Sequence, residues 1–330
     1  MEKVIIGSDV GGNSGKFVCN GQQVEITSVV SARKDGKLGK PKHGILFDSP
    51  PILVGDVALD FGANIDHKRT DEDWVVSDEF LHIFWAGCSE LFSAEEWIEN
   101  AMVVVGLPWQ TYLTDRERVI GVLKNTHTYT RDERIEQHIQ ITQVIPMPQA
   151  AGAGWSQIYS PNGLIARPEL LNGKFGVIDL GSKHINMVLM NEGIDVAEHC
   201  RTLDKGMWLI IERFAQIILE KLDRKLTAPE ARAAFLNKKL RNAGAMVDCT
   251  HMVDQAVSYH ASEIVNDIVA VWSRVWKSFD AIFICGGGAL IPVFPHELIK
   301  AFKNAVVVKS PVFANAEGNA NYGEWVALQE

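Results

Sequence analysis

Residues near the N-terminus combine an aspartate, several glycines and a lysine in a way that could bind phosphate and a metal ion. An apolar run delivers Asp9 into a glycine-rich turn at residues 11–15, and a second apolar run resumes after Lys16. Backbone N–H groups, a carboxylate and an ammonium then surround one small volume, which suits phosphate and a hard cation. A hairpin with a surface lysine would give the same pattern, so this stretch alone leaves both interpretations open.

A second stretch of the same kind begins near the middle of the chain. An apolar run ends in Asp179, a glycine and a serine follow in the turn, and another apolar run resumes. The order strand, Asp-x-Gly turn, strand, glycine turn, strand therefore occurs twice, in residues 4–28 and 175–199. Two halves of the chain therefore begin with the same strand–turn–strand motif, which indicates two similar units.

Two further segments could contribute to such a site. Three glycines at 286–288 follow an apolar run at 279–285, and bare backbone between a buried strand and a helix start lets a ligand approach closely. Gln149 ends another strand-like segment and precedes small residues at 150–154 that would let a helix pack closely against a neighbour. Two interpretations of this segment stay open: a functional role for Gln149, or simply a crowded helix start.

The elements that must position these residues follow from the hydrophobic pattern, which alternates between strand and helix periods. Strands are expected at 4–6, 16–19, 24–28, 45–47, 52–58, 101–108, 135–145, 175–190 as a hairpin, 194–199, 279–285 and 306–308. Helices are expected at 77–92, 94–100, 115–125, 207–224, 228–242, about 253–277 and near 321–328. Ser93 and Glu96 have the spacing of a capping box for the helix at 94–100.

Size and charge restrict the function. A chain of 330 residues suits two domains or one large bilobal unit. The net charge of −9 argues against broad direct binding of nucleic acid. The basic segment at 33–43 is the local exception, either as a solvated loop or as a contact for an acidic partner.

Cysteine usage and hydropathy indicate the compartment. The five cysteines are scattered and never at CxxC spacing, which favours reduced thiols over disulfides or zinc. The longest apolar helix candidate, 207–219, is interrupted by two charged residues, so we expect no membrane span. The start of the chain has no signal-peptide pattern, so we expect a cytoplasmic protein without membrane contact.

The two Asp-x-Gly hairpins, the Pro-Gln-x-x-Gly-Ala segment and the Gly-Gly-Gly turn, in this order, resemble the five nucleotide-site motifs of the actin superfamily, which includes actin, sugar kinases and large heat-shock chaperones. The chain is most similar to the bacterial plasmid-segregation actins of the ParM/StbA type. The resemblance covers nearly the whole length and includes residues 54–58, 105–108, 148–153 and 313–318.

This resemblance implies an α/β, actin-like (RNase H-like) bilobal ATPase fold: two similar mixed-sheet lobes with the nucleotide in the cleft. Lobe I would span 1–160, with a smaller subdomain inserted at about 33–98. Lobe II would span 161–330, with a helical subdomain inserted at about 203–275.

The resemblance also implies roles for residues at matching positions. Asp9 would hold Mg²⁺ through water, and Asp9, Asp179 and Gln149 would be the catalytic residues. The nucleotide would be ATP, with GTP left open. Its phosphates and nucleoside would contact Gly11, Gly12, Asn13, Ser14, Lys16, Gly181, Ser182, Gly286, Gly287 and Gly288. Glu212 would reach the base or ribose, although a solvated helix residue is the favoured interpretation there.

Two positions differ from what is usual among the plasmid actins. Gln149 can orient a water toward the γ-phosphate but cannot readily take its proton, which suits slow hydrolysis. Related plasmid actins often carry Glu there, whereas actin carries Gln. Lys183 and His184 stand where the family usually has small or hydroxyl residues. Either they point away from the site or they add positive charge near the phosphates.

The function implied is a slow ATPase coupled to polymerisation: self-association into filaments with ATP bound, and movement of plasmid DNA through a DNA-binding adaptor. A small-molecule kinase of the same superfamily is the main competing function, but such enzymes usually need an aspartate base, and none replaces Gln149. A non-plasmid cytoskeletal actin homologue and a chaperone-like nucleotide switch also stay open.

Overall fold

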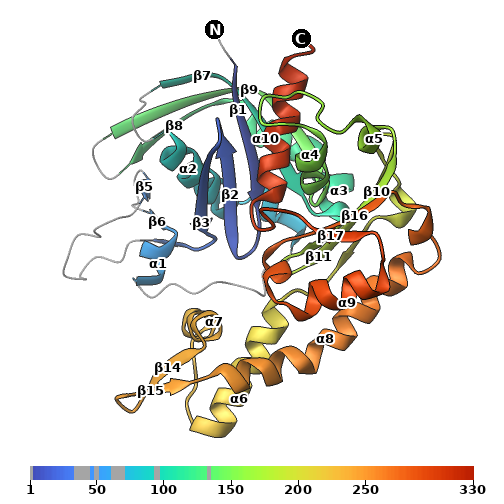
Figure 1. Ribbon diagram of the computed structural model, residues 1–330. Helices are drawn as coiled ribbons and strands as arrows, with labels where there is room; N and C mark the ends of the chain where they lie inside the picture. Colours follow the sequence, from blue (N-terminus) through green and yellow to red (C-terminus); the bar gives the residue numbers. More distant parts are fainter. Residues whose placement is uncertain (1–2, 33–44, 48–51, 61–70, 93–96, 132–134) are drawn as a thin grey trace.

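The computed structural model describes residues 3–32, 45–47, 52–60, 71–92, 97–131 and 135–330. Within these ranges the chain forms two mixed sheets, each covered by helices (Figure 1). This is the α/β bilobal arrangement that the sequence predicts, and we refer to the sheet-based halves as lobe I and lobe II.

The sheet of lobe I has the strand order β3-β2-β1-β7-β9-β8. Its central strands β1, β7 and β9 run parallel, while β2 and β3 form the antiparallel hairpin edge and β8 pairs antiparallel with β9. The strands are β1 (Val4–Val10), β2 (Ser14–Cys19), β3 (Gln22–Thr27), β7 (Trp97–Leu107), β8 (Thr126–Arg131) and β9 (Ile135–Pro148).

The sheet of lobe II repeats this plan with the order β12-β11-β10-β16-β17, and β13 pairs with β11. Here β10 is antiparallel to β11 and parallel to β16, as β1 is to β2 and β7. The strands are β10 (Lys174–Leu180), β11 (Ile185–Asn191), β12 (Ile194–Asp195), β13 (Arg201–Leu203), β16 (Ala281–Cys285) and β17 (Ala305–Val307).

Helices cover both sheets and extend lobe II downward in Figure 1. The longer helices are α2 (Asp78–Leu91), α3 (Trp109–Leu123), α4 (Ala151–Ile158), α6 (Trp208–Leu222), α7 (Ala228–Asn237), α8 (Thr250–Trp272), α9 (Val293–Ala301) and α10 (Ala314–Ala327). Short elements are α1 (Asp56–Asp60), α5 (Pro168–Leu171) and the 3-10 turns η1 (Asp71–Val76), η2 (Ala197–His199), η3 (Trp276–Ser278) and η4 (Gly287–Leu290). Two small sheets pair β4 (Val30–Ala32) with β6 (Ile52–Val54) and β5 (Ile45–Phe47), and β14 (Lys239–Asn242) with β15 (Ala245–Asp248).

The last helix, α10, packs on lobe I although it follows lobe II in the sequence. It contacts β1, β7 and α4, and small residues make this approach possible. A Cβ on Gly152 or Gly318 would clash with the backbone of the other helix, and a Cβ on Gly7 would clash with the backbone of α10. The expectation that small residues after Gln149 permit close helix packing is therefore confirmed. The limits 1–160 and 161–330 for the lobes, with their insertions, stay predictions.

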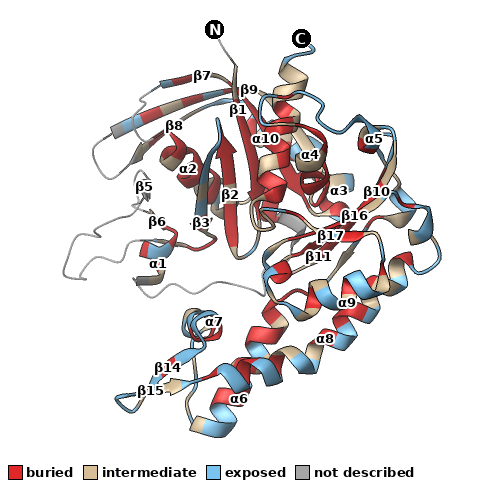
Figure 2. Cartoon of the chain, in the orientation of Figure 1, coloured by how far each residue is buried: buried red, intermediate tan, exposed pale blue. Residues whose placement is uncertain are grey.

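The hydrophobic cores lie between each of the two sheets and the helices that pack on it. Figure 2 shows the central strands and the facing sides of α4 and α10 buried, whereas α7 is buried on one side only and the β14–β15 hairpin is largely exposed. All five cysteines are buried and none forms a disulfide, as expected for reduced thiols. In the part of the chain that the structure describes, no helix has both the length and the apolar character needed to cross a membrane.

Several predicted elements are wrong. The helix expected at 94–100 is instead the start of β7 at Trp97, where side chains alternate between exposed and buried with the two-residue period of a strand. The capping pair Ser93 and Glu96 lies outside the described residues, as does the basic segment at 33–43. The strand expected at 52–58 ends at Val54, and α1 follows.

Two more differences lie in lobe II and one in lobe I. The helix expected at 228–242 ends at Asn237, because Lys238 takes a left-handed conformation with φ 53° and β14 begins after it. The strand expected at 194–199 is only Ile194–Asp195, followed by a 3-10 turn. The pattern at β8 was missed, because its alternation of threonine with His127 and Tyr129 is not an apolar run.

Candidate functional site

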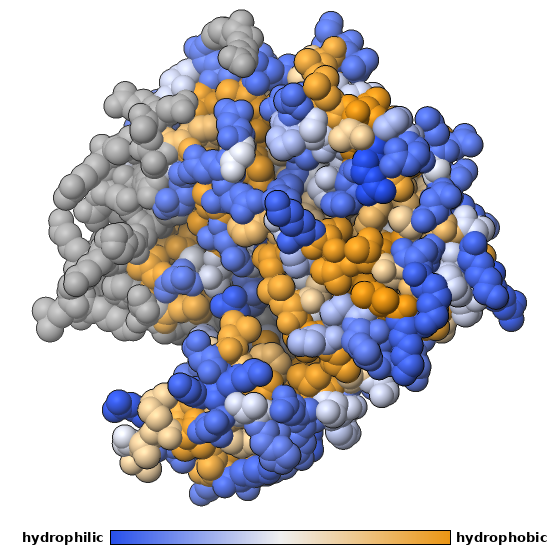
Figure 3. Space-filling view, viewed as in Figure 1, coloured by the Kyte–Doolittle hydropathy of each residue, from blue (hydrophilic) through white to orange (hydrophobic). Residues whose placement is uncertain are grey.

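A cavity of about 790 Å³ lies between the two lobes. In Figure 3 the surface is hollowed where the part built on α6 and α7 faces the rest of the molecule. The cavity brings together nearly all the predicted site residues, namely Asp9, Gly11, Gly12, Asn13, Ser14, Lys16, Gln149, Asp179, Gly181, Ser182, Gly286, Gly287 and Gly288. Glu212 does not line it: this residue is exposed on α6 and accepts a hydrogen bond from Trp208 Nε1 (3.1 Å).

The two aspartates occupy equivalent places in the two sheets. Asp9 is near the end of β1, opposite Lys16 on the antiparallel neighbour and Gly106 on the parallel one. Asp179 is near the end of β10, opposite Asn186 on the antiparallel neighbour and Cys285 on the parallel one. Both aspartates are buried, so each carboxylate is held at the carboxyl end of a central strand and faces the cavity.

The first loop, residues 11–14, is organised by hydrogen bonds within its hairpin and with the adjacent strand β3 and the residue after it. Gly11 N donates to Ser14 O (3.2 Å), and Ser28 Oγ donates to Gly11 O (2.6 Å). Lys16 Nζ donates to Ser14 O (3.1 Å), while Ser14 Oγ donates to Glu25 on β3 (2.6 Å). These bonds fix the loop before any ligand arrives, which lowers the entropy lost on binding.

The second loop, at Gly181 and Ser182, is instead held by the start of α6. Met207 N donates to Gly181 O (3.0 Å), and Trp208 N donates to Ser182 O (2.8 Å). Gly206 is required for this contact, because a Cβ there would clash with the backbone carbonyl of Ser182. The late glycine turn packs against the end of β10, just before this loop: Gly286 has φ 83°, and a Cβ on it would clash with the Asp179 carboxylate.

A chain of polar groups passes through Gln149 and joins the lobes twice. Gln149 Nε2 donates to Asp9 Oδ1 (2.8 Å), and Asn186 Nδ2 donates to Gln149 Oε1 (3.1 Å). Thr202 Oγ1 donates to Asn186 Oδ1 (2.9 Å) and accepts from Trp109 N (3.2 Å). The amide of Gln149 therefore has one defined orientation. Asn186 was missed at the sequence level, although the register of the hairpin would place it opposite Asp179.

A second missed residue, Asn315 on α10, contacts both aspartates. Its Nδ2 donates to Asp179 Oδ2 at 3.0 Å and to Asp9 Oδ2 at 3.4 Å. Three asparagines among alanines and glycines, at 315, 319 and 321, were the available signal. Asparagine is a weak helix former, so its repeated use in a helix indicates tertiary hydrogen bonds.

Electrostatics at the site favour a cation. Burial raises the pKa of Asp179, and the nearby Asp9 carboxylate raises it further, whereas Lys16 and the hydrogen bond from Asn315 act in the opposite direction. A divalent cation would stabilise both carboxylates in their charged form. Among the described residues there is no cluster of three or more His, Cys, Asp or Glu that could hold a metal. The donor set fits Mg²⁺, which is usually held by one or two carboxylates together with phosphate oxygens and water.

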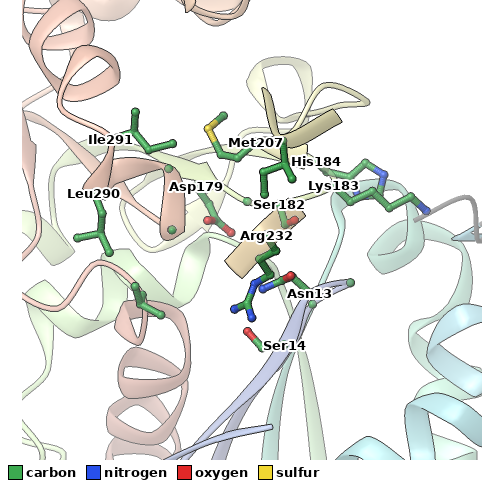
Figure 4. A pocket seen from close by; sticks show the side chains of 18 of the residues that line it. Asn13, Ser14, Asp179, Ser182, Lys183, His184, Met207, Arg232, Leu290 and Ile291 are labelled. Atoms are coloured by element: carbon green, nitrogen blue, oxygen red, sulfur yellow. The ribbon is translucent and has the colours of Figure 1, made fainter. Parts of the chain in front are cut away.

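The rest of the cavity is largely apolar and could hold a planar base. Its walls come from α6, α7, α8 and the turn after β16, with Met207, Ile211, Phe235, Val253, Val257, Leu290 and Ile291 among them. Arg232 reaches the cavity from α7 (Figure 4). The volume lies within the ~300–1,000 Å³ typical of ligand pockets. Sequence patterns did not reveal this wall, because it depends on how the helices of lobe II fold back over the sheet.

Lys183 and His184 line the cavity, but their side chains extend away from Asp179 and Ser14 in Figure 4. His184 Nε2 lies 3.6 Å from Asp204 Oδ1. Lys183 faces the first loop, since its Cβ would be 3.7 Å from a Cβ built on Gly12. Both side chains thus extend away from the Asp179 carboxylate, but the stem of Lys183 lies beside the first loop at Gly12.

Comparison with known families and structures agrees with this geometry. A family model described as "Actin like proteins N terminal domain" matches residues 7–152, and one described as "Archaeal actin homologue MreB-like, C-terminal" matches residues 177–293. The chain belongs to the actin-like protein superfamily. No curated protein sequence matches this actin-like chain.

Solved structures share the fold of this actin-like protein. A 15-stranded ParM filament from Clostridium botulinum is 22% identical, with a TM-score of 0.80, over 98% of this chain and 99% of that one. The archaeal actin homologue Ta0583 in complex with ADP is 19% identical, with a TM-score of 0.78, over 99% and 100% of the two chains. Bacillus thuringiensis ParM with AMPPNP is 15% identical, with a TM-score of 0.71, over 100% and 99%.

Proposed function

We propose that the protein is an ATPase that binds ATP with Mg²⁺ in the cavity between the lobes and hydrolyses it slowly. The observation that carries this proposal is the convergence of Asp9, Asp179 and Gln149, from different segments of the chain, on one cavity. Two glycine loops approach that cavity from opposite lobes. A site that closes on the phosphates from two sides supplies the positioning that phosphoryl transfer mainly requires.

Each residue has a defined task in this proposal. The backbone of residues 11–14, Lys16 and the loop at Gly181 and Ser182 bind the phosphates, and Asp9 and Asp179 hold the cation. Bound Mg²⁺ would offset negative charge on the phosphate oxygens. The oriented amide of Gln149 positions a water but does not remove its proton, so hydrolysis is slow. The apolar wall from α6 to α8 takes the base.

We also propose that the protein assembles into filaments when nucleotide is bound, and that these filaments move plasmid DNA through a DNA-binding adaptor. Support comes from the fold shared with a ParM filament from Clostridium botulinum and with an Alp12 filament, at 22% and 13% identity. The net charge of −9 is compatible with an adaptor making the DNA contact.

The test combines light scattering, electron microscopy and phosphate release. Mixing the purified protein with ATP and Mg²⁺ is expected to raise scattering, produce filaments and release phosphate slowly, whereas ADP or EDTA abolishes all three. A protein that stays monomeric at high concentration while it phosphorylates a metabolite contradicts the proposal and favours a small-molecule kinase. Loss of a low-copy plasmid after deletion of the gene, measured without selection, tests the role in segregation.

A further inference from the structure

The Asn315 side chain lies where the two lobes bring their carboxylates together. Asp9 belongs to lobe I and Asp179 to lobe II, and one amide nitrogen donates to an oxygen of each. Asn315 is itself only 4% exposed and both aspartates are buried, so bulk water does not compete for these hydrogen bonds. A single neutral donor therefore connects two buried carboxylates that belong to different sheets.

The orientation of this amide is determined by its other end. Asn315 Oδ1 accepts a hydrogen bond from Ala153 N (3.1 Å) in the first turn of α4. If the amide were rotated by half a turn, the oxygen would face two carboxylates and an N–H group would face another N–H group. Only the observed orientation satisfies all the groups, so the nitrogen is directed at the carboxylates.

The helix that carries Asn315 is held rigidly against the end of β1. One turn later, Asn319 Nδ2 donates to Ser8 O (2.9 Å), next to Asp9. The contacts of Gly152 and Gly318 bring the backbones of α4 and α10 together, so the helix cannot shift without a clash. Asn315 is therefore presented from a rigid platform, as a group that orients metal ligands must be.

We propose that Asn315 is a positioning residue of the site: its amide holds the Asp9 and Asp179 carboxylates in the arrangement that receives a divalent cation. This inference rests on the proposed function, because it concerns how the same site takes up the cation that accompanies the nucleotide. Asn315 acts through the two aspartates and is not itself a ligand. It also makes cation uptake dependent on lobe position, because its two partners belong to different sheets.

The test compares three variants with the unaltered protein by Mn²⁺ binding, measured by electron paramagnetic resonance. Asn315→Ala removes the donor. Asn315→Asp keeps the size but replaces the donor by a third carboxylate. Asn321→Ala is the matched control, since Asn321 is also a buried asparagine of α10 but donates to Tyr159 O (2.9 Å).

Asn315→Ala is expected to weaken Mn²⁺ binding in the presence of AMPPNP about 10-fold, as loss of a group that orients metal ligands typically does. Its affinity for AMPPNP in EDTA should stay within about twofold of Asn321→Ala, because the loops that hold the phosphates are unchanged. Asn315→Asp should have the opposite effect on the metal and bind Mn²⁺ alone about 10-fold more tightly than the unaltered protein, since ligand charge sets affinity for hard cations.

Three outcomes overturn the inference. One is an Asn315→Ala variant that matches Asn321→Ala in every measurement, which would make Asn315 a structural residue of the α4–α10 contact. Another is an Asn315→Asp variant that binds Mn²⁺ no better than the unaltered protein. If Asn315→Asp is unfolded without a cation, circular dichroism should report refolding when Mn²⁺ is added, and failure to refold also overturns the inference.

The proposed function and this inference fail in different ways. An unaltered protein that binds no AMPPNP with or without Mn²⁺ contradicts the proposed ATPase, and this inference falls with it. An unaltered protein that binds Mn²⁺ and AMPPNP, together with an Asn315→Ala variant equal to Asn321→Ala, leaves the ATPase in place and removes only the role of Asn315.

Discussion

The β1–β2 and β10–β11 hairpins place an aspartate at the same point of their sheets, but they stabilise the following loop differently. The first loop is held by hydrogen bonds with residues close to it in sequence, through Lys16 of its own hairpin, Ser14 to Glu25 on β3, and Ser28 just after β3. The second is held from outside by the start of α6, and the glycine turn after β16 packs against the end of β10 just before it. The first loop is thus preorganised locally, whereas the second depends on the packing of lobe II.

The residue opposite each aspartate also differs. Lys16 faces Asp9 across the first hairpin, and Asn186 faces Asp179 across the second. Burial is the main cause of the raised pKa of Asp179, with Asp9 as a second cause. The two carboxylates therefore share a position in their sheets but have different partners across the hairpin, and a cation would favour the charged form of Asp179.

The largest effect is expected where the second loop depends on outside packing. Gly206→Ala places a Cβ against the carbonyl of Ser182, so either α6 or the loop must move. We expect the free energy of unfolding to fall by about 3 kcal/mol, as overpacking against a rigid backbone does. Urea denaturation measures this change.

Gly12→Ala is the matched control on the first loop. A Cβ there would meet only Lys183 side-chain atoms at ordinary contact distance, 3.7 Å and 3.9 Å. Its stability should stay within about 0.5 kcal/mol of the unaltered protein. Equal losses in the two variants would show that the loops do not differ in the way proposed.

The second prediction concerns catalysis. Asp179→Ala should retain much of the nucleotide affinity, because the loops and Lys16 still contact the phosphates, but phosphate release should fall at least about 100-fold with the loss of an electrostatic group in the site. Steady-state phosphate release and fluorescent nucleotide titration separate the two quantities. Asp204→Ala is the control, since the Asp204 side chain is 91% exposed. Unchanged phosphate release in Asp179→Ala would remove this residue from catalysis.

Local pattern was enough to predict the parts of the site that lie next to each other in sequence. Each Asp-x-Gly turn is a short apolar run followed by glycine, so Asp9 and Asp179 were found without knowledge of the fold. Asn315 could not be found in this way, because its partner Asp9 is 306 positions away and its role depends on how α10 packs on lobe I.

The misplaced elements also depend on distant contacts. Of the helix expected at 94–100, residues 97–100 belong to strand β7 because β7 pairs with β9, and tertiary pairing overrides local propensity. Glu212 carries a carboxylate that could bind a ribose or base, and it lies on the helix that contributes Ile211 to the cavity wall. The face of α6 that it occupies, however, is turned to solvent. Which helix face meets the cavity is a property of packing and not of the helix alone.

The third prediction tests the amide partner of the second hairpin. Asn186→Ala frees Gln149 Oε1, so the amide loses its defined orientation. Phosphate release should fall about 10-fold through poorer positioning of the water, while nucleotide affinity stays unchanged. Thr202→Val removes the bond to Asn186 Oδ1 and the bond from Trp109 N but keeps the bond from Asn186 to Gln149, so it should lower the rate by a smaller factor, about threefold. Single-turnover phosphate release measures both, and a larger effect for Thr202→Val would contradict the proposed order of the contacts.

A smaller loss of stability than that of Gly206→Ala is expected in the first loop, because several hydrogen bonds hold it together. Ser14→Ala removes the bond from Ser14 Oγ to Glu25, but the bonds from Gly11 N and Lys16 Nζ to Ser14 O remain. The free energy of unfolding should fall by about 1 kcal/mol, the usual net contribution of one hydrogen bond. Urea denaturation of Ser14→Ala beside Gly206→Ala then measures the comparison directly: a self-contained loop loses one bond, whereas a loop held from outside loses its support.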